Sequence, residues 1–348
     1  GLDVVIFSPT FYLGLPQRRA ENPPRRSDSG ATASPLVCGW TREHDEFTRR
    51  LAEFESAEAA LLLPCGYSAC MASVSTLAEA GDLILSDQLN HASLIDGCRL
   101  SKAETFVYPH RDVDAAGDYL RKQRHRFDAA WWVTDTVFSM DGHVAPLVDV
   151  CRVAAEFDVK VIADEAHATG VLGPHGGGLV EATATGGQIA VRVGTLSKAI
   201  ASQGGFLMGD RQWMEYYVNF ARPLIYSTAL SLAAVRDARW FLDHPGQVSS
   251  ARDKVRSLSR RLRKQLGIES NDSDGQDIEN EVPIIPWHVG EDRDALRLQR
   301  QLAVEGFLVP AIRPPTVPEG TARLRISVSA VHTEAEIDRL AEAVKKLI

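Results

Sequence analysis

Short apolar runs alternate with longer segments of helical periodicity, and this alternation restricts the fold more than any other feature of the chain. The apolar runs cover residues 59–64, 82–86, 104–108, 129–134 and 159–164. Apolar residues recur at helical spacing over 111–126 and 146–157, between successive runs. Apolar strands that alternate with helices are typical of βαβ units around a buried, mostly parallel sheet. The sequence therefore predicts an α/β fold with a mostly parallel central sheet flanked by helices, a pattern that continues to about residue 210.

The segments before this repeat have a different character. Residues 16–35 are rich in Pro, Arg and Ser, which predicts an irregular surface segment. Over 42–57, Phe47, Leu51 and Phe54 recur at helical spacing among charged residues, which predicts an amphipathic helix.

The part after the repeat is also distinct. Residues 211–268 look mainly helical, and 269–281 is acidic and polar, as in an exposed loop. Strand-like runs then mix with helices over 292–305 and from Glu334 onward, which predicts a smaller C-terminal α/β domain.

The chain has 348 residues, about twice the ~150-residue prior for one domain. We therefore expect an N-terminal segment over 1–40, a large domain over 41–235 and a small domain over 236–348.

Composition excludes several classes of protein. The net charge is −8, from 38 basic and 46 acidic residues, which argues against general nucleic-acid binding. Five cysteines without a CxxC or Cys/His zinc spacing predict free thiols and no metal site. No apolar run approaches the ~20 residues that span a bilayer, so we expect a cytoplasmic protein without a membrane partner.

Two strand ends carry the residues best suited to chemistry. The run over 159–164 ends at Asp164, followed by Glu165, His167 and a glycine-rich turn. Ligands bind at the carboxyl ends of parallel strands, although this motif alone is also compatible with a metal site or a helicase box. A second run ends at Thr-Leu-Ser-Lys198, where burial would favour Schiff-base chemistry, whereas most lysines simply lie at the surface.

An aspartate and a lysine placed in this way suit pyridoxal phosphate. The carboxylate can bond the pyridinium nitrogen, and the amine can form an imine with the aldehyde. Gly66 lies in a turn before a predicted helix, whose N-terminus would favour a phosphate, and Thr195 offers a hydroxyl. His91 follows another strand, where it could stack on a flat ring or simply lie in a polar loop.

Eight motifs together resemble the α-oxoamine synthases, a family of fold-type I pyridoxal phosphate enzymes. They are FYLGL (11–15), GYSAC (66–70), LNHASLIDG (89–97), VFSMDGHVAPL (137–147), DEAHATGVLGPHGGG (164–178), GTLSKAIASQGG (194–205), LIYST (224–228) and AIRPPTVPEGTARLRISVSA (311–330). The resemblance covers nearly the whole chain, and the order and spacing of the motifs make it specific.

The resemblance implies four catalytic residues. Lys198 would hold the cofactor as an internal aldimine and move the proton of the substrate Cα. Asp164 would pair with the pyridine nitrogen, and His91 would stack over the ring. His167 would contact the phenolic oxygen together with Ser139.

The remaining implied contacts concern phosphate and substrate. Gly66, Tyr67 and Thr195 would bind the phosphate, and Ser227 and Thr228 would reach the phosphate of the neighbouring subunit. The resemblance thus implies a homodimer with active sites at the subunit interface. The substrate-binding residues would be Arg313, which suits a carboxylate, with Thr316 and Thr10.

The implied reaction is a decarboxylative condensation of an amino acid with an acyl thioester, which gives an α-amino ketone, CO2 and a free thiol. The loop at 311–325 is most similar to family members that join L-alanine to pimeloyl-CoA, or to a pimeloyl carrier protein, in biotin synthesis. One alternative is a sister enzyme that uses glycine or serine with another acyl-CoA. An aminotransferase, a lyase and a non-catalytic partner subunit are further alternatives, although the presence of Lys198 disfavours the last.

Several positions depart from the usual family pattern. Thr10 and Cys70 replace asparagines, and Asp135 replaces a glutamate. The N-terminal segment is also shorter than usual in the family. Because these changes cluster around the substrate, they bear on its identity more than on the cofactor.

Overall fold

The computed structural model describes residues 5–7, 12–13, 30–269 and 278–347. The chain divides into two compact units. The larger comprises residues 19–138 and 145–245, and the smaller combines 1–18, 139–144 and 246–348. The short insertion 139–144 therefore belongs with sequence far from it, which no local pattern indicates. No helix in the described ranges is long and apolar enough to cross a membrane.

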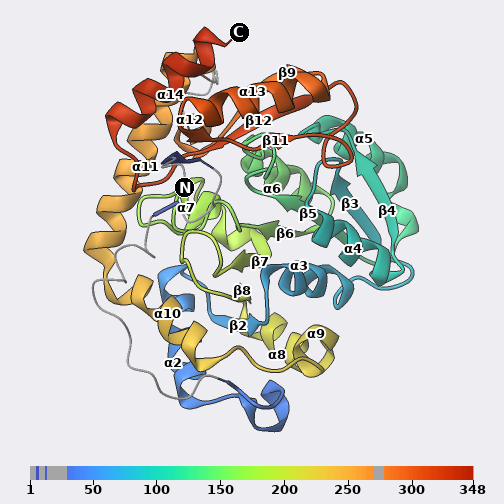
Figure 1. Cartoon of the computed structure of the whole chain (residues 1–348). Helices are drawn as coiled ribbons and strands as arrows, with labels where there is room; N and C mark the ends of the chain where they lie inside the picture. Colours follow the sequence, from blue (N-terminus) through green and yellow to red (C-terminus); the bar gives the residue numbers. More distant parts are fainter. Residues whose placement is uncertain (1–4, 8–11, 14–29, 270–277, 348) are drawn as a thin grey trace. The chain divides into compact units, whose positions relative to one another are not determined.

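A seven-stranded sheet organises the larger unit (Figure 1). Its order is β2 (Ala59–Leu63), β8 (Gly205–Gly209), β7 (Ile189–Thr195), β6 (Lys160–Asp164), β5 (Ala130–Asp135), β3 (Leu83–Asp87) and β4 (Glu104–Tyr108). β7, β6, β5, β3 and β4 pair in parallel, whereas β8 runs antiparallel to both β7 and β2. The predicted α/β class with a mostly parallel sheet is confirmed.

Each of the five apolar runs forms a strand, within one residue of the predicted bounds. The strands are buried because alternate side chains pack on opposite faces of the sheet. Trp131 and Val133 belong to the core that Ile162 and Val191 share. Trp132 points to the other face, where its indole N–H donates to the Tyr108 hydroxyl at 2.9 Å.

Helices cover the sheet. The core cluster with Trp131 and Val133 also contains residues of α3 (Gly66–Ser75), α4 (Ala92–Ser101), α8 (Arg211–Phe220) and α9 (Arg222–Ile225). α5 (Val113–Gln123) packs on β4, and α6 (Leu147–Glu156) packs on β6. α2 (Arg42–Phe54) contacts β2 and α10 (Leu232–Asp243), and α7 (Gly178–Ala182) follows the glycine-rich turn.

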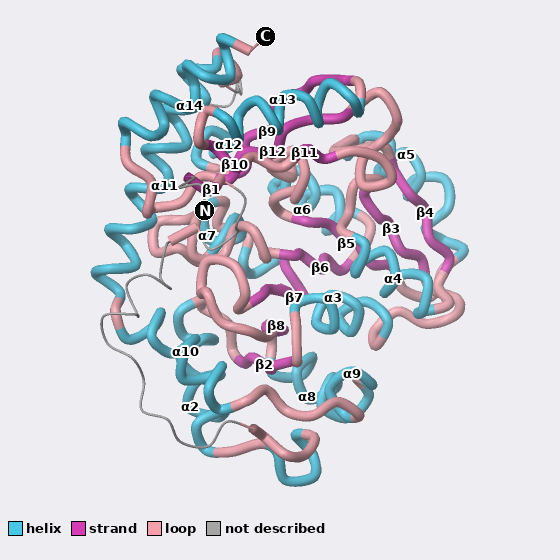
Figure 2. The backbone as a smooth tube through the Cα atoms, in the orientation of Figure 1, coloured by secondary structure: helices cyan, strands magenta, loops and turns pink. Residues whose placement is uncertain are grey.

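The smaller unit is also a mixture of strands and helices (Figure 2). β9 (Ile284–Gly290), β12 (Ala322–Ser327) and β11 (Ala311–Ile312) form an antiparallel sheet, and β1 (Val5–Ile6) pairs in parallel with β10 (Phe307–Leu308). α13 (Asp292–Val304) packs on β9 and β12. Arg261 of α11 (Pro245–Leu266) forms an ion pair with Asp338 of α14 (Glu334–Lys346).

Two sequence predictions need correction at their edges. The amphipathic helix expected over 42–57 ends at Phe54, because Ser56 adopts a left-handed φ of 53°. The sequence predicts an exposed loop over the acidic segment 269–281, but Ile278–Glu281 forms the short helix α12. Glu281 of this helix forms an ion pair with Arg256 at 3.1 Å. Residues 270–277 of that segment, and 16–29 of the expected N-terminal irregular segment, lie outside the described residues.

Candidate active site

The carboxyl ends of three parallel strands bring the polar residues of the larger unit together. Asp135 and Asp164 are the last residues of β5 and β6 and lie opposite each other in the strand register. Thr195 ends the adjacent strand β7, and Lys198 follows it in the next turn. Both aspartates are buried, each with 3% of its surface exposed. The site expected at this edge of the sheet is therefore assembled from strand ends, as such sheets favour.

Asn90 fixes the position of His91. Its side-chain amide donates to the Val133 carbonyl at 2.8 Å, and its Oδ1 accepts from the Asp135 N–H at 2.9 Å. The next residue, His91, donates its own backbone N–H to Asp135 Oδ2 at 2.6 Å and caps α4. Two successive residues after β3 are thus hydrogen-bonded to β5, so the His91 ring is placed by the sheet rather than by a free loop.

Charge links His91 to the other candidate residues. Partial burial lowers the pKa of His91, and the nearby Lys198 cation adds to this, while the Asp164 carboxylate opposes it. Burial raises the pKa of Asp135 well above its usual range, and the charge of Asp164 raises it further, against the opposing effects of the His91 N–H and of Lys198. The structure therefore places His91, Asp164, Lys198 and Asp135 close enough for their charges to affect one another.

Asp164 is held, through its carboxylate and its backbone carbonyl, by groups from three segments. Its Oδ1 accepts from the Ala166 N–H at 2.8 Å, and its Oδ2 accepts from the Cys70 thiol at 3.0 Å. The backbone carbonyl of Asp164 accepts from both the N–H and the hydroxyl of Thr136, each at 2.9 Å. His167 lies in the turn that follows and is buried. These contacts orient a buried carboxylate at the strand end.

The N-terminus of α3 approaches the end of β7 closely. A Cβ at Gly66 would lie 3.0 Å from both Cβ and Oγ1 of Thr195, so only glycine allows this distance without displacement. Thr195 Oγ1 also lies 2.8 Å from Ser197 Oγ and accepts from the Ser197 N–H at 3.2 Å. Free N–H groups of a first helical turn beside hydroxyls form a typical anion cradle. Tyr67 follows in the same turn, with its hydroxyl on Asp96.

A second layer of buried charge lies behind Asp164. The adjacent Glu165 accepts from the N–H groups of Leu179 and Val180 at 2.7 and 3.1 Å, which holds the glycine-rich turn against the end of β6. Arg192 of β7 donates to the Glu55 carbonyl at 2.6 Å and lies 3.5 Å from its carboxylate. Burial raises the pKa of Glu165 to about 8, and the charge of Glu55 adds to this effect. Burial also raises the pKa of Glu55 to about 7, and the opposing charge of Arg192 only partly offsets the effect of burial on either carboxyl.

Other predicted site residues belong to the smaller unit or lie outside the described residues. Ser139, Arg313 and Thr316 belong to the smaller unit, where the Ser139 carbonyl accepts from Arg325 Nε at 2.6 Å. Arg313 and Thr316 are exposed in one turn, closed by the Thr316 N–H on the Arg313 carbonyl at 3.0 Å. Thr10 lies outside the described residues.

Ser227 and Thr228 follow α9 in the larger unit. Ser227 is half-buried and Thr228 is exposed. Their neighbour Tyr226 is 71% exposed.

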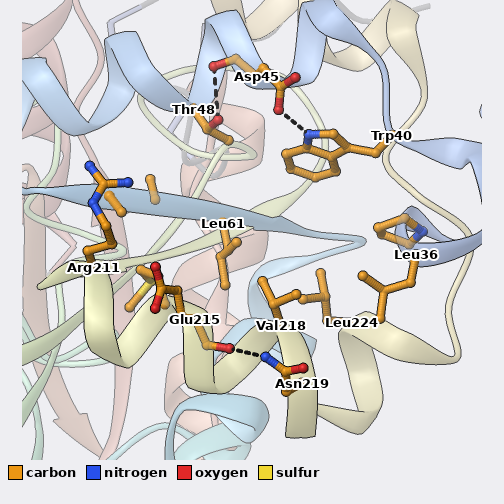
Figure 3. A pocket seen from close by; sticks show the side chains of 14 residues that line it. Leu36, Trp40, Asp45, Thr48, Leu61, Arg211, Glu215, Val218, Asn219 and Leu224 are labelled. Atoms are coloured by element: carbon orange, nitrogen blue, oxygen red, sulfur yellow. Dashed lines mark hydrogen bonds between the residues drawn. The ribbon is translucent and has the colours of Figure 1, made fainter.

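A pocket of about 430 Å³ opens in the larger unit between α2, β2, α8 and the segment at 35–40 (Figure 3). Trp40 forms one wall, with its indole N–H on Asp45 at 2.6 Å, and Leu36 and Leu224 form another. Arg211 and Glu215 of α8 supply its charged rim. None of the candidate catalytic residues lines this pocket, so it is separate from the strand-end site.

Sequence reasoning did not assign three residues that the geometry places in the site: Asp135, Cys70 and Ser93. The sequence marks the first two only as departures from a family pattern. For Asp135 the strand-end rule that located Asp164 would have sufficed. No sequence signal distinguishes Ser93 from an ordinary residue of a first helical turn. The five cysteines are free thiols, as predicted, with Cys70, Cys98 and Cys151 buried.

Comparison with known proteins defines the class. The family model described as "Aminotransferase class I and II" matches residues 15–344, and the chain belongs to this family. A putative 8-amino-7-oxononanoate synthase of Bacillus licheniformis is 40% identical over 96% of this chain and 88% of its own length. The 8-amino-7-oxononanoate synthase of Marinobacter nauticus is 41% identical over 99% of this chain and 88% of its own length.

Solved structures show the same fold. A serine palmitoyltransferase from S. paucimobilis with a bound PLP-myriocin aldimine superposes with a TM-score of 0.87 at 28% identity, over 100% of this chain and 89% of the other. The 8-amino-7-oxononanoate synthase of Francisella tularensis gives a TM-score of 0.75 at 25% identity, over 99% and 97%.

The donor set of the strand-end site fits pyridoxal phosphate. A buried carboxylate at Asp164 suits a protonated ring nitrogen, and a half-buried amine at Lys198 suits an aldehyde carbon. The close approach of Gly66 to Thr195 leaves the backbone N–H groups of the first turn of α3 for a phosphate, while the Thr195 hydroxyl donates to the Gly204 carbonyl at 3.0 Å.

Proposed function

We propose that this chain is a pyridoxal phosphate-dependent acyltransferase that condenses L-alanine with a pimeloyl thioester, giving 8-amino-7-oxononanoate, CO2 and free thiol for biotin synthesis. The supporting observation is the identity of about 40%, over nearly the full chain, to relatives that bear this enzyme name. The strand-end site with Asp164 and Lys198 agrees with the cofactor. The similarity to serine palmitoyltransferases is lower, at 28% identity.

The residues of the strand-end site take complementary roles. Pyridoxal phosphate, when bound, supplies an electron sink that stabilises negative charge at the substrate Cα. The Asp164 carboxylate holds a proton on the pyridine nitrogen. The Lys198 amine removes the Cα proton of the amino acid and later returns one to the same carbon. His91 stacks on the ring, and His167 and Ser139 hydrogen-bond the phenolic oxygen.

Binding of phosphate and substrate uses the helix terminus and the exposed turn. The N–H groups of Gly66 and Tyr67, with the hydroxyl of Thr195, bind the phosphate. The Arg313 guanidinium binds the amino-acid carboxylate through its planar fork, with Thr316 and Thr10 beside it. Bond formation between the substrate Cα and the thioester carbonyl expels the thiol, and loss of CO2 from the former carboxylate leaves the amino ketone.

A homodimer completes this proposal. Ser227 and Thr228 would contact the phosphate of the neighbouring subunit, so the site would be shared between two chains. Exposed apolar side chains in neighbouring segments support an interface. α9 contacts both the segment 35–39 and α8. In or beside these segments, Tyr226 is 71%, Val37 77% and Phe220 58% exposed in the single chain. Large exposed apolar side chains that lie close together mark interaction surfaces.

The visible absorption spectrum of the purified protein, titrated with amino acids, tests the function. With pyridoxal phosphate bound, we expect the band to shift with L-alanine and product to form only when pimeloyl-CoA or a pimeloyl carrier protein is added. A shift with glycine or L-serine alone would transfer the assignment to a sister condensing enzyme. Amino-group transfer to a keto acid without thiol release would identify an aminotransferase.

The Lys198→Ala variant is the control for the cofactor linkage. This variant should still bind pyridoxal phosphate, but borohydride reduction should no longer attach the cofactor covalently to the protein. If reduction still attached the cofactor to the protein in this variant, Lys198 would not be the attachment site.

A further inference from the structure

One strand of the smaller unit carries two buried arginines on the same face. Arg323 and Arg325 are two residues apart in β12, so their side chains project to the same side of the sheet. Leu324 projects to the other side, where it lines a small cavity with Leu298 and Leu302 of α13. Only 5% of Arg323 and 6% of Arg325 is exposed. Because burying a cation is costly unless it is paired and hydrogen-bonded, the partners of these two guanidiniums are informative.

Both arginines bind the segment 139–144, which lies far from them in the sequence and is called the serine segment below. Arg325 Nε donates to the Ser139 carbonyl at 2.6 Å. Arg323 donates through one of its terminal nitrogens to the carboxylate of Asp141, and both side chains of this ion pair are buried. The serine segment is therefore attached to β12 at two positions by side chains of the same face.

Arg323 also binds the turn that joins β11 to β12, residues 313–321, which is called the arginine turn below. Its Nε donates to the Thr321 carbonyl at 3.0 Å, and its other terminal nitrogen donates to Thr321 Oγ1 at 3.2 Å. The Thr321 hydroxyl donates its single proton to the Pro318 carbonyl at 2.7 Å, which closes the turn. The hydrogen bonds therefore form one continuous path from the Asp141 carboxylate to the backbone of the arginine turn.

We propose that Arg323 and Asp141 are positioning residues that hold the serine segment and the arginine turn in a fixed relative position within the smaller unit. One planar guanidinium that is bonded to both segments prevents either from shifting alone. The consequence rests on the proposed function, in which Ser139 bonds the phenolic oxygen of the cofactor and Arg313 binds the carboxylate of the amino acid. Arg323 would then set the spacing between a cofactor contact and a substrate contact without touching either ligand.

Hydrogen–deuterium exchange on the full chain, without any ligand, measures this coupling. Thr321→Val removes the hydroxyl that accepts from Arg323, whereas Thr321→Ser keeps it and is the matched control. Because the guanidinium loses a bond to the arginine turn, we expect Thr321→Val to speed exchange about threefold in the serine segment as well as in the turn itself. Thr321→Ser should leave exchange in the serine segment unchanged. Faster exchange confined to the arginine turn in Thr321→Val would overturn the proposal.

Variants of Asp141 act from the other segment. Asp141→Ala removes the acceptor of Arg323, and we expect exchange about tenfold faster in the arginine turn. Asp141→Asn keeps an oxygen that accepts more weakly than a carboxylate, so its effect there should be about threefold. Asp338→Asn, which weakens the ion pair between α11 and α14, should leave both segments unchanged. Wild-type exchange in the turn of folded Asp141→Ala would contradict the coupling. If Asp141→Ala does not fold, because a buried cation is left unpaired, the two Thr321 variants decide.

The protein with pyridoxal phosphate bound gives a second readout. We expect Asp141→Asn, which alters the serine segment, to raise the Kd for L-alanine about threefold. Thr321→Val, which alters the arginine turn, should shift the absorption band of the cofactor before any amino acid is added. An unchanged Kd together with an unchanged band would contradict the consequence for the site. If the wild type bound neither cofactor nor amino acid, the proposed function would fail, while hydrogen exchange would still decide whether Arg323 couples the two segments.

Discussion

Asp135 and Asp164 lie directly opposite each other at the ends of adjacent parallel strands, and the structure assigns them different tasks. Asp164 accepts from the Cys70 thiol and from a backbone N–H of its own turn, whereas Asp135 accepts from the backbone N–H of His91. Two buried carboxyls this close favour one charge over two, which agrees with the raised pKa of Asp135. One aspartate can thus serve the ligand while the other holds a neighbouring segment.

This division of roles predicts how substitutions of Asp135 behave. Asp135→Asn keeps an oxygen for the His91 N–H and adds no buried charge, so it should change the free energy of unfolding by less than about 1 kcal/mol. Asp135→Ala leaves that N–H without an acceptor and should cost about 2 kcal/mol. Urea denaturation at pH 7 measures both. Equal losses in the two variants would show that the hydrogen bond to His91 does not matter.

The contact between Gly66 and Thr195 predicts a selective loss of cofactor. In Gly66→Ala the new Cβ would lie 3.0 Å from the Thr195 side chain and would push the N-terminus of α3 away from β7. We expect the Kd for pyridoxal phosphate to rise about tenfold, equivalent to ~1.4 kcal/mol, with a circular dichroism spectrum like that of the wild type. Gly187→Ala, where a Cβ meets nothing within 4 Å, is the matched control. An unaltered Kd in Gly66→Ala would remove this cradle from the phosphate site.

Gly178 is predicted to be far less tolerant of substitution than Gly187. It adopts a φ of 83°, and an added Cβ would lie 1.7 Å from Glu165 Oε2, inside the contact that caps α7. Gly178→Ala should therefore destabilise the fold by about 3 kcal/mol or more. Chemical denaturation of this variant beside Gly187→Ala measures the difference, and similar midpoints for the two would contradict the packing described.

The buried pair Glu55 and Glu165 predicts a stability that falls as pH rises. Both carboxyls have raised pKa values, about 7 and about 8, against an ordinary 4.5. The folded chain therefore retains protons that the unfolded chain has lost. Their contribution to stability is complete below about pH 4.5 and disappears as pH rises to about 8, with a slope of up to ~1.4 kcal/mol per pH unit for each group.

Unfolding free energies measured from pH 5 to pH 9 check this. Glu55→Gln keeps the oxygen that accepts from Thr169 at 3.0 Å but cannot titrate, so its slope should be shallower. Glu53→Gln, at an exposed site near the end of α2, should leave the slope unchanged. Parallel curves for Glu55→Gln and the wild type would place the titration elsewhere.

The strands and the strand-end residues could be predicted because a local sequence pattern indicates each of them. Apolar runs located the strands, and the strand-end rule located Asp164 and Lys198 before any contact was known. The antiparallel direction of β8 was not predictable, since the run GFLMG at 205–209 looks the same in either direction. The grouping of residues 139–144 with the C-terminal residues was also not predictable. It involves long-range contacts such as the one between Arg325 and the Ser139 carbonyl.

The candidate site shows the same limit. His91 is recognisable beside its strand, but Cys70, which donates to Asp164, comes from α3, and only tertiary packing brings this helix to β6. The position of a side chain within a helix does not indicate which residue of another element it contacts.

The antiparallel pairing of β8 with β7 has a mechanical consequence for Lys198. Thr195 and Gly205 are paired across the two strands, and the Leu196 N–H donates to the Gly204 carbonyl at 2.9 Å, so the segment that carries the lysine is clamped at both ends. The backbone conformation of this segment is therefore fixed, whereas the four-carbon side chain of Lys198 can still rotate about its own bonds. If Lys198 carries the cofactor as proposed, the amine can leave and return by rotation of its side chain alone, while the backbone of its segment stays in place.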